Sequence, residues 1–85
     1  MSGEAMLLEA AKVVAQRRQA YGDAGPLMAA VAARWSITLG QPVTSAQVVL
    51  CLIDLKLARL SHDPVHADSI LDVAGYAAVL REVAR

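Results

Sequence analysis

The chain has 85 residues, 56% apolar and 19% charged, and its eight lysines and arginines balance eight acidic residues. This length fits one domain, residues 1–85. The zero net charge leaves no basic surplus to neutralise a nucleic-acid backbone, which disfavours general nucleic-acid binding but allows a local cationic pocket for a small phosphorylated ligand.

Two helices are predicted in the first half of the chain, separated by glycine and proline. The first spans about Glu4 to Ala20, and Gly22 after it suits a left-handed helix cap. Pro26 opens the second helix as a first-turn residue, and this helix continues to about Leu39. No segment alternates with a two-residue period, so the predicted fold class is all-α.

The second half is predicted to form an antiparallel helical hairpin. The segment from Thr44 to Gln47 matches a capping box, so Thr44 caps a third helix that ends near Leu60. The fourth helix begins at Asp63-Pro64 or at Asp68 and ends near Ala84. The third helix is apolar nearly all round, which favours it as the central helix of a compact four-helix bundle.

The turn of this hairpin places cations close to carboxylates. Lys56 and Arg59 share a face near the end of the third helix, and Asp68 and Asp72 lie in the first turns of the fourth. Antiparallel packing brings them to one level, because a helical turn advances only about 5.4 Å. We therefore predict a salt bridge or hydrogen bond between one of these cations and one of these carboxylates.

Polar residues also lie on helix faces that are otherwise apolar. Arg17, Arg18 and Tyr21 continue the apolar face of the first helix, so the arginines either reach past the core to solvent or meet an anion. Gly75 and Val79 share a face of the fourth helix with carboxylates. The carboxylates alone would be typical of a solvated surface. A glycine inside a helix costs about 1 kcal/mol relative to alanine, so we expect something to pack closely there.

Four other residues each have a structural interpretation beside a functional one. Trp35 is expected to anchor a core or an interface, and a base-stacking surface is the alternative. His62 and His66 have the spacing of metal ligands on a helix, but they straddle a proline and lack a third ligand, which favours solvated side chains. Cys51 lies in an apolar helix, where we expect a buried and inert thiol.

The apolar content exceeds what one small core needs, so we expect a homo-oligomer; the alternative is that the helices bury an unusually apolar central helix. A single cysteine fits a reducing cytoplasm, and no targeting segment is visible. The most apolar run, from Val48 to Leu60, is too short to span a bilayer and contains two charged residues. We therefore expect a protein of the host-cell cytoplasm without a membrane partner.

A series of short motifs covers most of the chain. They are Arg17-x-x-x-Tyr21-Gly22-Asp23, Trp35-Ser36, Leu39-Gly40, Val43-Thr44, Leu55-Lys56-Leu57-Ala58-Arg59-Leu60, His66-x-Asp68-Ser69 and Asp72-x-x-Gly75-Tyr76-Ala77. Their order and spacing resemble a domain family of unknown function that is common in phages and prophages. The last helix is also similar in layout to MazG-like all-α nucleotide pyrophosphohydrolases. Those enzymes hold magnesium with Glu-x-x-Glu and Glu-x-x-Asp motifs; here Ser69 and Asp72 match the later motif loosely, and the earlier motif is absent.

These observations lead to an expected function, the binding of a nucleotide or another small phosphorylated ligand. The expected ligand residues are Arg17, Lys56 and Arg59 for the phosphate, and Tyr21, Trp35 or Tyr76 for stacking on a base. One alternative, implied by the resemblance, is a divergent magnesium-dependent pyrophosphohydrolase with Asp54, Asp68 and Asp72 as the metal ligands. The other is a non-enzymatic module that binds itself or a host protein.

Overall fold

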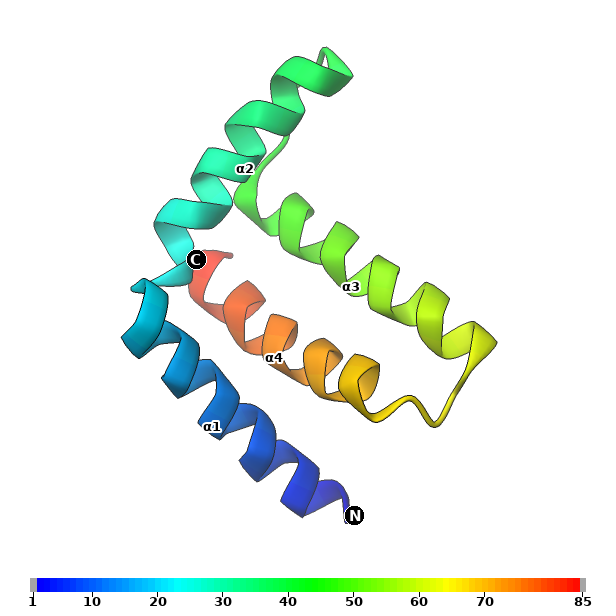
Figure 1. Cartoon of the computed structure of the whole chain (residues 1–85). Coiled ribbons are helices and arrows are strands. Elements are labelled where there is room, and N and C mark those ends of the chain that lie inside the picture. Colours follow the sequence, from blue (N-terminus) through cyan, green and yellow to red (C-terminus); the bar gives the residue numbers. More distant parts are fainter. Residues whose placement is uncertain (1, 85) are drawn as a thin grey trace.

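A computed structural model describes residues 2–84 and shows four helices and no strand in this range (Figure 1). The helices are α1 (Gly3–Tyr21), α2 (Ala24–Leu39), α3 (Ser45–His62) and α4 (Ala67–Val83). The predicted all-α class and the C-terminal hairpin are confirmed. The observed helix ends differ from the predicted ones by at most two residues when the later of the two predicted starts is taken for α4.

Local chemistry sets these helix ends. The Thr44 hydroxyl accepts a hydrogen bond from the Gln47 amide at 3.1 Å, and the Gln47 side chain accepts one from the Thr44 amide at 2.9 Å. This is the predicted capping box. Gly40 ends α2 in the left-handed conformation, with φ +68°. Gly22 ends α1 with φ +82° but ψ −171°, so it shows the positive φ that favours glycine without the left-handed helical conformation that we predicted.

The centre of the bundle is α4 rather than α3. The hairpin helices α3 and α4 are antiparallel, α1 runs alongside α4, and α2 crosses one end of the pair (Figure 1). Because α4 contacts all three other helices, the prediction that α3 is central is wrong. No helix within residues 2–84 covers the outer side of α3, where Leu50 and Leu57 are each about half exposed. A helix that is apolar nearly all round is therefore not necessarily the central helix of the bundle.

The core lies where α2, α3 and α4 meet. Met28, Ala32, Val48 and Val49 are its buried members, and the partly buried Trp35 packs against them, as expected of a core anchor. The α4 side chains that pack against this cluster are Tyr76, Val79, Leu80 and Val83. Because these residues include much of one face of α4, the core fixes α4 as the scaffold on which α1 is placed.

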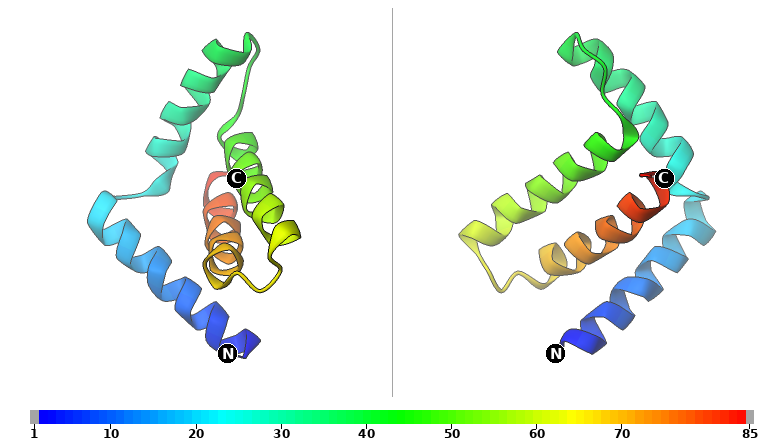
Figure 2. Two further views of the ribbon diagram at one scale, coloured as in Figure 1. Left: turned by 45° about the vertical axis from the view of Figure 1, so that its right-hand side comes forward. Right: turned by 180° about the vertical axis from the view of Figure 1, so that it is seen from behind.

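The bundle is elongated and leaves much apolar surface uncovered. Its extents are 42 × 31 × 21 Å, and α2 projects beyond the α3–α4 pair (Figure 2). Cys51 is exposed because no helix within residues 2–84 covers it, so the predicted buried thiol is wrong. None of the helices in residues 2–84 combines the length and apolar character needed to cross a membrane.

Candidate functional site

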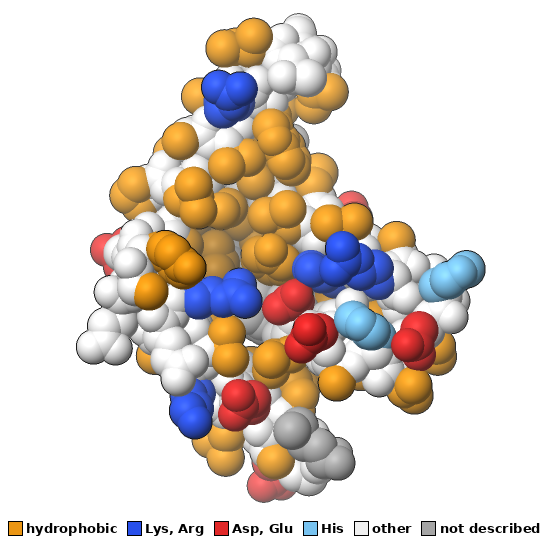
Figure 3. All heavy atoms as spheres, in the orientation of Figure 1, with side chains coloured by type: hydrophobic (Ala, Val, Ile, Leu, Met, Phe, Trp, Pro, Cys, Tyr) orange, Lys and Arg blue, Asp and Glu red, His pale blue; other side chains and the backbone are white. Residues whose placement is uncertain are grey.

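A cleft of about 530 Å³ opens where α1, α2 and α4 meet. This volume lies within the range of roughly 300–1,000 Å³ that is typical of small-molecule sites. Apolar side chains from all four helices line it, namely Val14, Leu27, Met28, Leu52, Leu71 and Val79. Figure 3 shows a hollow with apolar walls on this face, and charged side chains of both signs beside it.

Four of the nine predicted site residues line this cleft: Arg17, Tyr21, Asp72 and Tyr76. The first two belong to the last turns of α1 and the other two belong to α4, so the packing of α1 along α4 brings them together. Tyr21 is 84% exposed, which leaves its ring free at the rim. Tyr76 is partly buried and packs against the core, which fixes its ring in the wall.

The other five predicted site residues do not line the cleft: Trp35, Asp54, Lys56, Arg59 and Asp68. Trp35 belongs to the core, where its ring packs against the buried cluster. Arg59, Asp54 and Asp68 are exposed, and none of the three has an ion pair within residues 2–84.

Lys56 reaches the site indirectly, through Asp72. Its Nζ lies 3.0 Å from Asp72 Oδ2, and the two side chains are only 13% and 26% exposed. This contact confirms the predicted ion pair across the hairpin. Because Lys56 balances the charge of Asp72, an anion in the cleft would meet a neutral pair rather than an isolated carboxylate.

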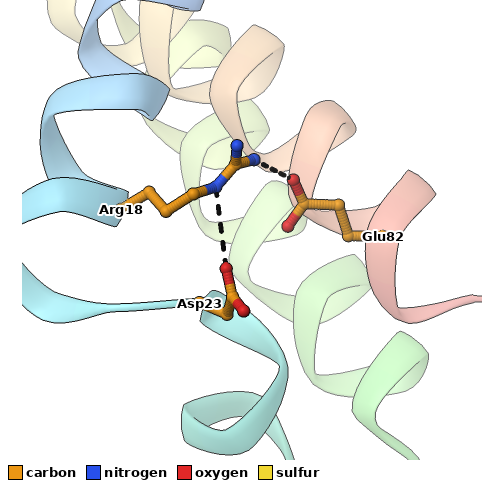
Figure 4. A network of polar contacts seen from close by, with 3 residues as sticks. All are labelled: Arg18, Asp23 and Glu82. Atoms are coloured by element: carbon orange, nitrogen blue, oxygen red, sulfur yellow. Dashed lines mark hydrogen bonds and ion pairs between the residues drawn. The ribbon is translucent and has the colours of Figure 1, made fainter.

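A second ion-pair network closes one edge of the cleft (Figure 4). Arg18 Nη2 donates to Glu82 Oε1 of α4, and Arg18 Nε lies 3.7 Å from Asp23 Oδ1 in the α1–α2 link. All three residues line the cleft. Sequence reasoning had placed Arg18 where it could meet an anion but did not name its partners, since their proximity depends on how α1 lies on α4.

Comparison with known proteins places the chain in a family. A model of a domain of unknown function, DUF6378, matches residues 5–84. The chain belongs to this family. Over 69 residues it is also 38% identical to the Gene 55 protein of Mycobacterium phage L5. The matched region covers 80% of this chain and 44% of that relative, so this chain spans less than half of the relative's length. No solved structure matches the chain.

The family and the phage relative confirm the resemblance to a phage domain of unknown function. They give no support to the similarity with MazG-like pyrophosphohydrolases. The cleft of this DUF6378 domain must therefore be interpreted from its own residues.

The residues of this DUF6378 domain do not fit the magnesium site that the pyrophosphohydrolase resemblance implies. Within residues 2–84, no three histidine, cysteine or acidic side chains form a group that could hold a metal ion. Asp54 precedes Lys56 by two positions and therefore lies on nearly the opposite side of α3, about 160° away. Lys56 faces α4, so Asp54 faces away from the carboxylates of α4.

His66 has a structural role in this domain. It is the N-cap of α4, where its Nδ1 accepts a hydrogen bond from the Ser69 amide at 3.2 Å. The Ser69 hydroxyl, in a residue that is only 1% exposed, lies 2.8 Å from the same nitrogen. The motif His66-x-Asp68-Ser69 thus includes a helix cap, which the sequence reading did not recognise because histidine is an uncommon capping residue.

Proposed function

We propose that this DUF6378 domain binds a nucleotide or another small phosphorylated ligand in the cleft between α1, α2 and α4. The observation that carries this proposal is Arg17, an arginine without an ion pair or hydrogen bond within residues 2–84, in a largely apolar cleft flanked by two tyrosines. A guanidinium group offers a planar fork of donors that matches two oxygens of a phosphate.

The charges around the cleft favour Arg17 as the phosphate contact. The other lining arginine, Arg18, is engaged by Glu82 and Asp23, and Lys56 is engaged by Asp72. Among residues 2–84, Arg17 is therefore the lining cation of this cleft that is left for a ligand. The three cations Arg17, Arg18 and Lys56 balance the three carboxylates Asp23, Asp72 and Glu82, so a phosphate beside Arg17 meets no net negative charge from this set.

The two tyrosines fit an aromatic base. Tyr21 at the rim has its ring free to move onto a ligand, and Tyr76 presents a fixed ring in the wall. Stacking of a base on an aromatic side chain contributes about 1–3 kcal/mol in single-stranded nucleic-acid complexes. A nucleotide would use both parts of the cleft at once, whereas inorganic phosphate would use only the arginine.

Calorimetric titration with nucleoside mono-, di- and triphosphates and with cyclic dinucleotides tests this proposal. We expect at least one of them to bind more tightly than a Kd of about 1 mM, which corresponds to roughly −4 kcal/mol. Replacing the charged donor by Arg17→Gln should weaken this binding about tenfold or more. Arg34→Gln, at an exposed arginine of α2 outside the cleft, is the matched control.

Two results would contradict the proposal. One is the absence of any nucleotide with a Kd below about 1 mM. The other is an equal loss of affinity in Arg17→Gln and Arg34→Gln, because it would show a non-local charge effect. We also expect nucleoside triphosphates to be recovered intact after incubation with magnesium; pyrophosphate release that Asp72→Asn abolishes would favour the enzymatic alternative instead.

A further inference from the structure

The isolated chain exposes more surface than a compact monomer of its mass. Its accessible surface is 6053 Å², whereas a folded monomer of 9.0 kDa is expected to expose about 4,900 Å². The radius of gyration is 13.7 Å, against about 12 Å for a single domain of this length. The surface excess of about 1,200 Å² indicates that part of this chain is shaped to be covered.

Apolar side chains make up much of the concave face between α2 and α3. Leu27 on α2 is 59% exposed and Leu55 on α3 is 49% exposed. Leu27 and the partly buried Leu52 line the cleft, and Leu55 follows Leu52 by about one turn of α3. Leu55 shares the face of Leu52, because three residues along a helix return to within about 60°. Figure 3 shows apolar side chains from α2 across to α3, continuous with the hollow of the cleft.

We propose that a second copy of this chain packs on this concave face and closes the cleft. If each copy covers its excess of about 1,200 Å², the dimer buries about 2,400 Å² in total, which falls within the 2,000–5,000 Å² typical of obligate homodimers. An apolar centre with charged side chains at its edge is the usual layout of such an interface.

A second copy is a suitable occupant because a two-fold axis pairs the same patch with itself. An apolar patch is self-complementary in this arrangement, and a chain with zero net charge does not repel its copy at long range. The exposed area and the placement of the apolar residues do not involve a ligand. The proposed dimer is therefore expected whether or not the cleft binds a nucleotide.

Light scattering coupled to size-exclusion chromatography tests the dimer in the absence of any ligand. At micromolar concentration we expect a mass of about 18 kDa, twice the 9.0 kDa of the chain. Leu55→Glu should give the mass of the single chain, because a dimer would then bury an unpaired charge in its interface and would dissociate. Leu57→Glu is the matched control, since Leu57 is also 49% exposed on α3 but lies about 160° away from Leu55 around the helix.

Circular dichroism of Leu55→Glu and Leu57→Glu checks that both variants remain helical. If Leu55→Glu does not fold, Leu55→Ser replaces it, because serine removes the apolar contact without adding a charge. Leu55→Ser should shift the dimer toward the single-chain mass. A wild-type mass of 9 kDa at micromolar concentration would overturn the proposal and would point to a different protein, or another part of a longer chain, as the cover. Dissociation by Leu57→Glu but not by the Leu55 variants would also overturn it, because the partner would then lie on the opposite flank of α3.

Discussion

At the scale of single residues, the contact between Lys56 and Asp72 has the largest expected effect on stability. Each side chain is less than a third exposed, so removal of one leaves the other charge partly desolvated. We expect Asp72→Ala to lower the free energy of unfolding by about 2 kcal/mol, less than for a fully buried pair, as measured by urea denaturation. Asp54→Ala removes an exposed carboxylate without an ion pair in residues 2–84 and should cost about 0.5 kcal/mol or less. Equal losses in the two variants would contradict this account of the pair.

The His66 cap gives a second prediction at the residue scale. His66→Ala removes the acceptor of the Ser69 amide and leaves the buried Ser69 hydroxyl without its partner. We expect a loss of about 1 kcal/mol, or roughly 4–8 °C in Tm for a domain of this size. His66→Asn keeps an acceptor that suits a helix N-cap and should restore most of this stability. Thermal unfolding that is lowered equally by both substitutions would show that capping is not what His66 contributes.

At the scale of elements, Gly75 shows how α1 lies on α4. A Cβ added at Gly75 would stand 3.9 Å from Val14 Cγ2, which is ordinary van der Waals contact. The expectation that something packs against this face is therefore confirmed, but the approach leaves room for a methyl group. We expect Gly75→Ala to raise the free energy of unfolding by about 0.5–1 kcal/mol in denaturant titrations, because alanine is the better helix former. A destabilised Gly75→Ala variant would mean that α1 lies closer to α4 than described.

The docking of α1 is also expected to be the weakest in the bundle. Within the described residues α1 has one buried side chain, Ala10, and α4 is the helix against which it mainly packs. We expect the amides of α1 to exchange with deuterium before those of α3 and α4, since opening α1 exposes little apolar surface. Glu82→Gln, which weakens the contact with Arg18, should speed exchange in α1 without changing α3. Equal protection of α1 and α4 in the wild type would contradict this order.

The features that could be predicted from the sequence depend on residues close together along the chain, and the features that were missed depend on how distant helices pack. Helix ends depend on nearby residues such as Thr44 and Gln47, so they could be predicted closely. The Lys56–Asp72 pair could be predicted because a short link fixes how two helices meet. The placement of Arg17 and Tyr76 in one cleft depends on how α1 docks on α4, which no local pattern encodes. The identity of the central helix was missed because an apolar face has the same pattern in a core and at an uncovered surface.

At the scale of the whole molecule, the cleft between α1, α2 and α4 lies next to the concave apolar face between α2 and α3. The cleft holds Arg17 and two tyrosines, and the face holds Leu27 and Leu55. A second copy on that face would exclude water from the cleft and strengthen the interaction of Arg17 with a phosphate, because charge interactions grow as the local dielectric constant falls. The two proposals are thus physically compatible, although each has its own test.

The most direct test of nucleotide binding in the cleft is an amide chemical-shift titration by NMR with each of the four deoxynucleoside triphosphates. We expect the largest shifts at four residues that line the cleft, namely Arg17, Tyr21, Gly75 and Tyr76. Shifts centred on the exposed cation Arg59, or no shifts up to a nucleotide concentration of about 1 mM, would contradict nucleotide binding in the cleft.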